Sequence, residues 1–246
     1  IRDRGYRASE LPFSFENSAG QLVGYDIDLA HLLAHDLGVS LEFVAVTRGE
    51  TAPLLEDGTI DIVMSGFAVT PARAVEMAFS TPYLDQTLAF VVPDHRRNEF
   101  ATSASVKSLR GLRVAVPDLP YLKAQVANYL NDAELVVVES PRQFFESPEP
   151  LAEALVYSAE AGSAWTLLHP AYSVVIPQPD VVRMPIAYPV AQGNDSLRNF
   201  LNTWLEFKRR DRSLDRLYDH WVLGKSPKDS TPRWSVVRDV LGWVNS

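Results

Sequence analysis

The sequence predicts an α/β fold arranged as two lobes. Segments with helical and strand-like patterns of apolar residues alternate along the chain, as is typical of α/β proteins. A polar run at residues 94–111 interrupts this alternation, and a new strand–helix–strand series follows it. The chain has 246 residues, which is enough for one large domain or for two lobes of ordinary size.

The first half of the chain contains the clearest helix. Residues 24–38 place Ile27, Leu33 and Leu37 on one face at helical spacing, and Gly38 provides the C-terminal stop. "SLEFVAV" is a predicted strand because apolar and β-branched residues dominate it. A short helix in "TAPLLEDG" then precedes two further predicted strands, "IDIVM" and "LAFVVP".

The second half repeats the strand–helix–strand order. "LRVAVP", a helix at about residues 122–130 and "ELVVVE" form one unit, and "LAEALVYSAEAGSAWTLL", "YSVVIP" and "YPVAQG" continue the alternation. "DSLRNFLNTWLEFKRRD" is a long amphipathic helix that Asp195 or Ser196 caps. Thr231 and Pro232 start a further helix, whose apolar stripe either packs on the first lobe or contacts another domain. The stripe consists of Trp234, Val237, Leu241 and Val244.

The composition excludes several functional classes. A formal net charge of −8 argues against a nucleic-acid-binding protein, because such proteins present basic surfaces. No stretch approaches the ~18 consecutive apolar residues of a transmembrane helix. The lack of cysteine rules out disulfides, thiolate nucleophiles and cysteine-based metal sites. No signal peptide is recognisable, so we expect a mature form or a segment of a larger protein.

The sequence gives little indication of a metal-binding, phosphate-binding or nucleophilic motif. His31 and His35 are four residues apart, but no metal-protease glutamate lies between them, so a solvated helix face explains them better than a metal site. Glycine-rich phosphate loops and the serine nucleophile elbow are both missing. We therefore expect neither a metal nor a cofactor.

Arg73 is the residue whose surroundings most need an explanation. It lies in "GFAVTPARAVEMAFS", where small and apolar residues surround one cation and one anion. Thr70 and Pro71 predict a helix start, which places Arg73 in a first turn directly after a strand. Strand ends in open α/β sheets face the ligand crevice, and a guanidinium is a forked donor for a carboxylate. The alternative is a solvated surface pair with Glu76.

Three segments resemble the extracytoplasmic solute-binding proteins of family 3, the polar amino-acid type. They are "LPFSFENSAGQLVGYDIDLAHLLAHDLG", "LLEDGTIDIVMSGFAVTPARAVEMAFSTPYL" and "SLRGLRVAVP" with the closing "GNDSLRNFLNTWLEFKRRDRSLDRLYDHWV". The resemblance implies a type II periplasmic-binding-protein fold, with a ligand cleft between two lobes and a two-strand hinge. The expected bounds are 1–87 and 188–224 for lobe 1, 88–187 for lobe 2, 225–246 for a helical tail, and hinge strands near 86–91 and 184–188.

The resemblance also implies residues that contact the ligand. Arg73 matches the family's arginine that holds the ligand's α-carboxylate, and it follows the strand-end Gly66. Phe13 and Phe15 alternate at the N-terminal turn, so we expect one ring to face the core and the other the ligand; the alternative is that both lie in the core. Where many relatives have threonine, this chain has Ala68, which removes a hydroxyl from the carboxylate site.

The remaining expected contacts depart further from the family pattern. Arg48 stands where relatives carry a second aromatic residue, and it is either an anion contact or a solvated loop charge. In lobe 2, "DLPYLKA" replaces a turn of small residues, so Asp118 and Tyr121 are candidates for side-chain contacts. Glu160 either meets the ligand's ammonium group or is an acid at a helix start that Ser158 caps.

From these features we expect a periplasmic or otherwise extracytoplasmic binding protein, not an enzyme. Its ligand would be an amino acid or a related organic acid, and its partner an ABC-type or fused membrane transporter or a sensor. We expect a monomer that does not bind nucleic acid. The main alternative is an enzyme similar to periplasmic cyclohexadienyl dehydratases, with Glu160 as general acid and Arg73 as substrate clamp. A ligand-sensing receptor domain and a peptide-binding module are further alternatives.

Overall fold

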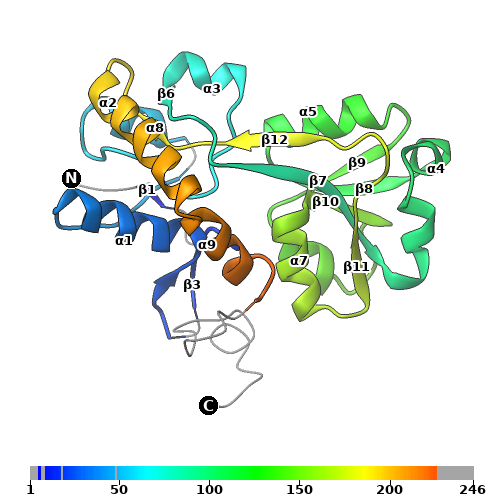
Figure 1. Ribbon diagram of the computed structural model, residues 1–246. Helices are drawn as coiled ribbons and strands as arrows, with labels where there is room; N and C mark the ends of the chain where they lie inside the picture. The colour runs from blue at the N-terminus through cyan, green and yellow to red at the C-terminus, as the bar shows by residue number, and fades with distance from the viewer. Residues whose placement is uncertain (1–4, 7–8, 18, 48, 226–246) are drawn as a thin grey trace. The chain divides into compact units, whose positions relative to one another are not determined.

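Two compact units make up the protein. Unit 1 comprises Ile1–Asp85 and Pro185–Ser246, and unit 2 comprises Gln86–Met184. Both units combine helices with strands, which confirms the predicted α/β class (Figure 1). Arg48 and the tail beyond residue 225 lie outside the described residues. The computed structural model describes residues 5–6, 9–17, 19–47 and 49–225.

The sheet of unit 2 is built from strands that are apolar along nearly their whole length. Its order is β11–β7–β10–β8–β9, with β12 also paired to β7. β8 runs parallel to β9 and β10, and β7 runs antiparallel to β10 and β11. The strands are β7 (Leu84–Pro93), β8 (Arg113–Pro117), β9 (Glu134–Val138), β10 (Ala154–Ser158), β11 (Tyr172–Val175) and β12 (Arg183–Ile186).

Both faces of this sheet are covered, which explains the continuous apolar runs. On β8, Val114 lies in one cluster with Leu122 of α5, whereas the next residue, Ala115, lies in another with Phe144 of α6. Successive side chains of a strand point to opposite faces, so the two clusters are the two layers of the core. The helices of unit 2 are η1 (Asp94–Phe100), α4 (Ser103–Ser108), α5 (Pro120–Tyr129), α6 (Pro141–Glu146) and α7 (Ala159–Leu168).

Unit 1 contains shorter strands. β2, β3 and β4 form an antiparallel sheet, β1 pairs parallel with β5, and β6 pairs antiparallel with β13. The predicted strand "IDIVM" is fully or partly buried, and Ile62 forms a bridge with Val190 of β13. The strands are β1 (Gly5–Tyr6), β2 (Ser9–Glu10), β3 (Ser14–Glu16), β4 (Leu22–Val23), β5 (Val44–Ala45), β6 (Ala78–Phe79) and β13 (Pro189–Val190).

The helices of unit 1 follow the predicted pattern closely. The first predicted helix forms, and Gly38 ends it with a φ of 66°, a left-handed conformation that glycine adopts at low cost. The long C-terminal helix begins one residue earlier than expected, because Asn194 caps it by accepting from the Leu197 N–H. Asp195 is already the first helical residue. The helices are α1 (Tyr25–Leu37), α2 (Thr51–Glu56), α3 (Pro71–Glu76), α8 (Asp195–Arg210) and α9 (Ser213–Trp221).

Two aspartates of α1 hold the C-terminal helices. Trp221 of α9 donates its indole N–H to Asp28 at 2.7 Å, and Trp204 of α8 donates to Asp36 at 2.8 Å. Lys208 also lies 2.7 Å from Asp36, and its hydrogen bond is the main cause that lowers the pKa of that carboxyl. Both indoles are buried, as expected for packing residues, and each also satisfies a carboxylate.

Asp36→Asn should therefore destabilise unit 1. Hydrogen bonds to charged groups contribute more than neutral ones, so we expect a loss of about 1–2 kcal/mol in the free energy of unfolding. Because the folded-state pKa is lowered, this contribution is present above the ordinary aspartate pKa and is lost as the pH falls through the lowered value. Urea denaturation followed by tryptophan fluorescence at several pH values measures both effects.

The matched control is Asp132→Asn. Asp132 pairs with Arg110 at 2.5 Å, but these side chains are 66% and 80% exposed. Exposed pairs contribute under about 1 kcal/mol, so the control should lie close to wild type. Equal losses in the two variants would contradict the assigned role of Asp36.

Candidate functional site

Arg73 lies in the first turn of the short helix α3, as predicted. Thr70 has an extended backbone conformation, and its hydroxyl accepts from the Arg73 N–H at 3.3 Å. Pro71 occupies the first helical position, where its missing N–H costs nothing. The local sequence alone therefore places the Arg73 backbone.

Two neighbours orient the Arg73 guanidinium. Nη1 donates to the backbone carbonyl of Ala68 at 2.8 Å, and the guanidinium carbon lies 4.3 Å from the centre of the Phe67 ring. Among the described residues, no ion pair joins Arg73 to Glu76, so the alternative of a surface pair between them is not seen. A carbonyl and an aromatic face orient the cation. Arg73 is half-buried, so part of it is accessible.

The segment that precedes Arg73 is held rigidly by the core. Gly66 has a φ of 58°, and its N–H donates to the buried carboxylate of Asp26 at 2.6 Å. A Cβ at this position would lie 2.6 Å from Cδ2 of Phe13, so only glycine fits. Ala68 is 2% exposed and forms a bridge with Ile186. These two residues position Arg73 through their backbones.

Phe13 and Phe15 do not divide between core and surface. Phe13 is 1% exposed and contacts Tyr25 edge to face, and Phe15 is 3% exposed and contacts Trp221 in the same way. Neither ring has a face for a ligand, so the expectation that one of them lines the site is corrected. In an extended chain, residues two apart point to the same face, so the positions of Phe13 and Phe15 on either side of Ser14 do not separate the two rings.

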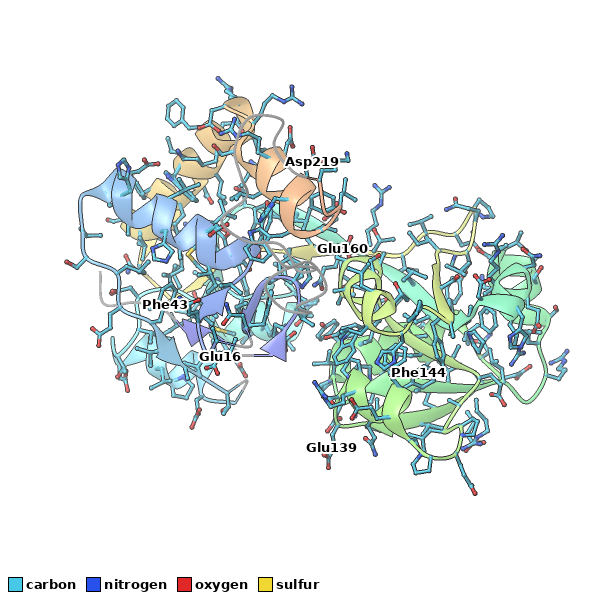
Figure 2. The ribbon with its side chains drawn as sticks, turned by 90° about the horizontal axis from the view of Figure 1, so that it is seen from below. Glu16, Phe43, Glu139, Phe144, Glu160 and Asp219 are labelled. Carbon is cyan, nitrogen blue, oxygen red and sulfur yellow. The ribbon has the colours of Figure 1, made fainter. Side chains whose placement is uncertain are left out.

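The residues of unit 2 that were expected to contact the ligand lie at the starts of two helices, α7 and α5. Ser158 caps α7 by accepting from the Ala161 N–H at 3.2 Å, as predicted. Glu160, in the first turn of α7, is 5% exposed and accepts from the Thr87 N–H at 3.3 Å (Figure 2). This hydrogen bond stabilises the charged carboxylate inside the unit.

The other two candidates of unit 2 lie at the start of α5. Lys123 donates to the exposed carboxylate of Asp118 at 2.6 Å. Tyr121 is half-buried and packs against the core cluster that contains Leu122. Both side chains therefore have structural contacts, and a role in ligand binding stays a prediction for each.

The sequence analysis missed the central polar contact of unit 1. Asp26 is fully buried, and its carboxylate accepts from Tyr83 at 2.7 Å and from Tyr188 at 3.0 Å, as well as from Gly66. The available signal was a carboxylate within the apolar stretch "YDIDLA", since a buried charge requires donors. The sequence does not indicate which residues supply those donors, because they come from distant parts of the chain.

Neither a metal-binding cluster nor a membrane-spanning helix occurs among the described residues. No three histidine, aspartate or glutamate side chains in this part of the chain gather closely enough to hold a metal ion. Over the same residues, every helix is too short or too polar to span a bilayer.

Comparisons with known proteins identify a family over nearly the whole chain. The model of the bacterial extracellular solute-binding proteins, family 3, matches residues 4–224. The putative ABC transporter arginine-binding protein 2 of Escherichia coli is 25% identical over 222 residues, which cover 87% of each chain. Cyclohexadienyl dehydratase of Pseudomonas aeruginosa is 24% identical over 211 residues, which cover 86% of this chain and 78% of that protein.

A solved structure gives a consistent result. An ancestral amino acid-binding protein, described as a precursor of cyclohexadienyl dehydratase, aligns with a TM-score of 0.76 and 31% identity. The alignment covers 89% of this chain and 93% of that one. An arginine-bound ancestral arginine-binding protein aligns with a TM-score of 0.72 and 26% identity, over 88% of this chain and 96% of that one.

Gly66→Ala should destabilise the protein through two separate effects. Alanine in a left-handed conformation costs about 1–2 kcal/mol, and forcing a methyl group against Phe13 adds about 1–3 kcal/mol. Gly58→Ala is the matched control, because Gly58 has a φ of 74° in the same unit but no atom within 4 Å of its added Cβ. Urea denaturation should show a clearly larger loss for Gly66→Ala, and equal losses would contradict the described packing.

Proposed function

Because the chain belongs to the bacterial extracellular solute-binding proteins, family 3, we propose that it binds a small ligand through a carboxylate that Arg73 holds. The observation that carries this proposal is the fixed orientation of Arg73. Its guanidinium is aimed by the Ala68 carbonyl and the Phe67 ring, so little side-chain entropy is lost when a ligand binds. A guanidinium also matches the geometry of a carboxylate better than an ammonium group does.

An α-amino acid is the ligand class that we propose. Two of the similar proteins are an arginine-binding protein and an ancestral amino acid-binding protein, so L-arginine is the first compound to test. An amino acid needs an acceptor for its ammonium group as well as Arg73 for its carboxylate. Glu160 of unit 2 is the proposed acceptor, because it is an acidic side chain in the first turn of α7. A dicarboxylate would instead need a second cation.

We also propose where the protein acts and with which partner. We place the protein outside the cytoplasm and assign it to the delivery of its ligand to a membrane transporter, because the relatives named above include binding proteins of ABC transporters. We propose that it acts as a monomer.

Arg73→Ala should weaken ligand binding by roughly 30-fold or more, because breaking a desolvated charge pair typically costs about 2–5 kcal/mol. Arg73→Lys should recover only part of the affinity, since an ammonium group lacks the fork. A thermal-shift screen of amino acids and small carboxylates first identifies the best ligand, which raises the unfolding temperature of the folded protein. Calorimetric titration of that ligand into wild type and both variants then measures the loss.

Arg198→Ala is the matched control. Arg198 lies in the same unit and pairs with Asp195 at 2.8 Å on the surface of α8, so the change in net charge is identical. Its affinity should equal that of wild type. If Arg73→Ala also binds with unchanged affinity, Arg73 is not the carboxylate clamp.

A dehydratase activity is the second candidate, favoured by the similarity to cyclohexadienyl dehydratase. Such an enzyme would need Glu160 as a protonated general acid. Among the described residues, Glu160 accepts a hydrogen bond from the Thr87 N–H, and we identify no second acid or base beside it, so we prefer a binding protein.

We therefore expect no product when the protein is incubated with prephenate and the mixture is resolved by chromatography. Glu160→Gln keeps an acceptor for the Thr87 N–H but cannot supply a proton. Turnover by wild type that disappears in Glu160→Gln would establish the enzyme and reject the proposal of a binding protein.

A further inference from the structure

A single buried carboxylate joins three separate segments of unit 1. Asp26 is 0% exposed at the start of α1. Its Oδ2 accepts from the Gly66 N–H at 2.6 Å and from the Tyr83 hydroxyl at 2.7 Å, and its Oδ1 accepts from the Tyr188 hydroxyl at 3.0 Å. A buried charge is costly unless donors surround it, so these bonds are strong constraints on all three segments.

The three segments lead to functionally important places. Gly66 begins the segment that continues through Ala68 to Arg73. Tyr83 lies just before the chain leaves unit 1 after Asp85, and Tyr188 lies just after the chain returns to unit 1 at Pro185. One carboxylate therefore contacts the segment of the proposed ligand clamp and both connections between the units.

The two tyrosines are themselves fixed. Their rings stack with centroids 4.3 Å apart, and the hydroxyl of Ser80 accepts from the Tyr188 N–H at 3.0 Å. Burial, followed by the charge of Asp26, raises the pKa of both phenols well above the ordinary tyrosine value. Both hydroxyls therefore stay protonated, and both keep donating over the physiological pH range.

We infer that Asp26 is a positioning residue that holds the Arg73 segment and both inter-unit connections together as one block. The carboxylate is planar, so donors on Oδ1 and Oδ2 fix one common orientation. Loss of the Tyr188 hydroxyl removes a donor from Oδ1, so the carboxylate is held less firmly and its bonds to Gly66 and Tyr83 on the other oxygen weaken. The block itself does not depend on the proposed function; its effect on ligand affinity does rest on it.

Amide hydrogen exchange of the ligand-free protein, measured by NMR, tests whether Asp26 holds these segments together as one block. Asp26 variants are unsuitable, because they are expected to misfold when three donors lose their acceptor. Tyr188→Phe removes only a hydroxyl. We expect the protection of the Gly66 amide to fall by about tenfold or more, as for a lost hydrogen bond to a charged group, together with the protection of the chain around Tyr83.

Tyr25→Phe is the matched control. Tyr25 is buried in the same cluster and stacks on Tyr83 with centroids 6.0 Å apart, but its hydroxyl donates to the Leu214 carbonyl and not to Asp26. Its loss should leave the Gly66 amide within about threefold of wild type, well below the effect of a lost charged hydrogen bond. Faster exchange confined to the residues around Tyr188, or an equal effect of both variants on Gly66, would overturn the inference.

Calorimetric titration with L-arginine as the probe gives a second measurement. Tyr188→Phe should weaken binding by about 2- to 30-fold, the range for mutations that change coupling without touching the ligand. Tyr25→Phe should leave the affinity unchanged even where both variants lose the same thermal stability. If wild type does not bind L-arginine, the proposed ligand is wrong, whereas the exchange experiment still decides the role of Asp26.

Discussion

The buried carboxylate of Asp26 is the constraint on which the arrangement of unit 1 depends. A charge with no exposure must be surrounded by donors, and these come from Gly66, Tyr83 and Tyr188. The need for these donors also constrains the residues around them. Gly66 must turn its N–H inward, which requires a left-handed backbone, and Phe13 fills the space where a side chain at Gly66 would lie. The glycine, the phenylalanine and the two tyrosines are thus consequences of one charged group.

The two units are stabilised in different ways. Unit 2 relies on a continuous sheet whose strands are apolar on both faces, so its order follows from hydrophobic burial and ladder hydrogen bonds. In unit 1, the described parts of β1–β6 and β13 have two or three residues each, and β7 and β12 run through the connections to unit 2. Carboxylates of α1 add side-chain contacts within this unit, because Asp26, Asp28 and Asp36 each accept from an aromatic side chain.

This difference has a functional meaning. A binding residue is useful only if its geometry is maintained while the ligand comes and goes. Arg73 is placed by a helix cap, a carbonyl and an aromatic ring, all within one short stretch of sequence. That stretch is anchored through Gly66 to the same carboxylate that contacts both connections between the units. Such an anchor would keep the geometry of Arg73 constant in its proposed role as a carboxylate clamp.

The sequence by itself determined the α/β class, the helices with clear periodicity, and the cap that places Arg73 in a first turn. These features depend on residues that are close together in the chain, such as Thr70 and Pro71 before Arg73, so local rules suffice. The family resemblance was also readable, because its motifs are contiguous. Only the tertiary structure decided which side chains face the interior. Phe13 and Phe15 are both buried, since helix α9 and the Gly66 turn cover them from far along the chain. The donors to Asp26 are 40, 57 and 162 residues away, and no local pattern carries information about partners at such separations.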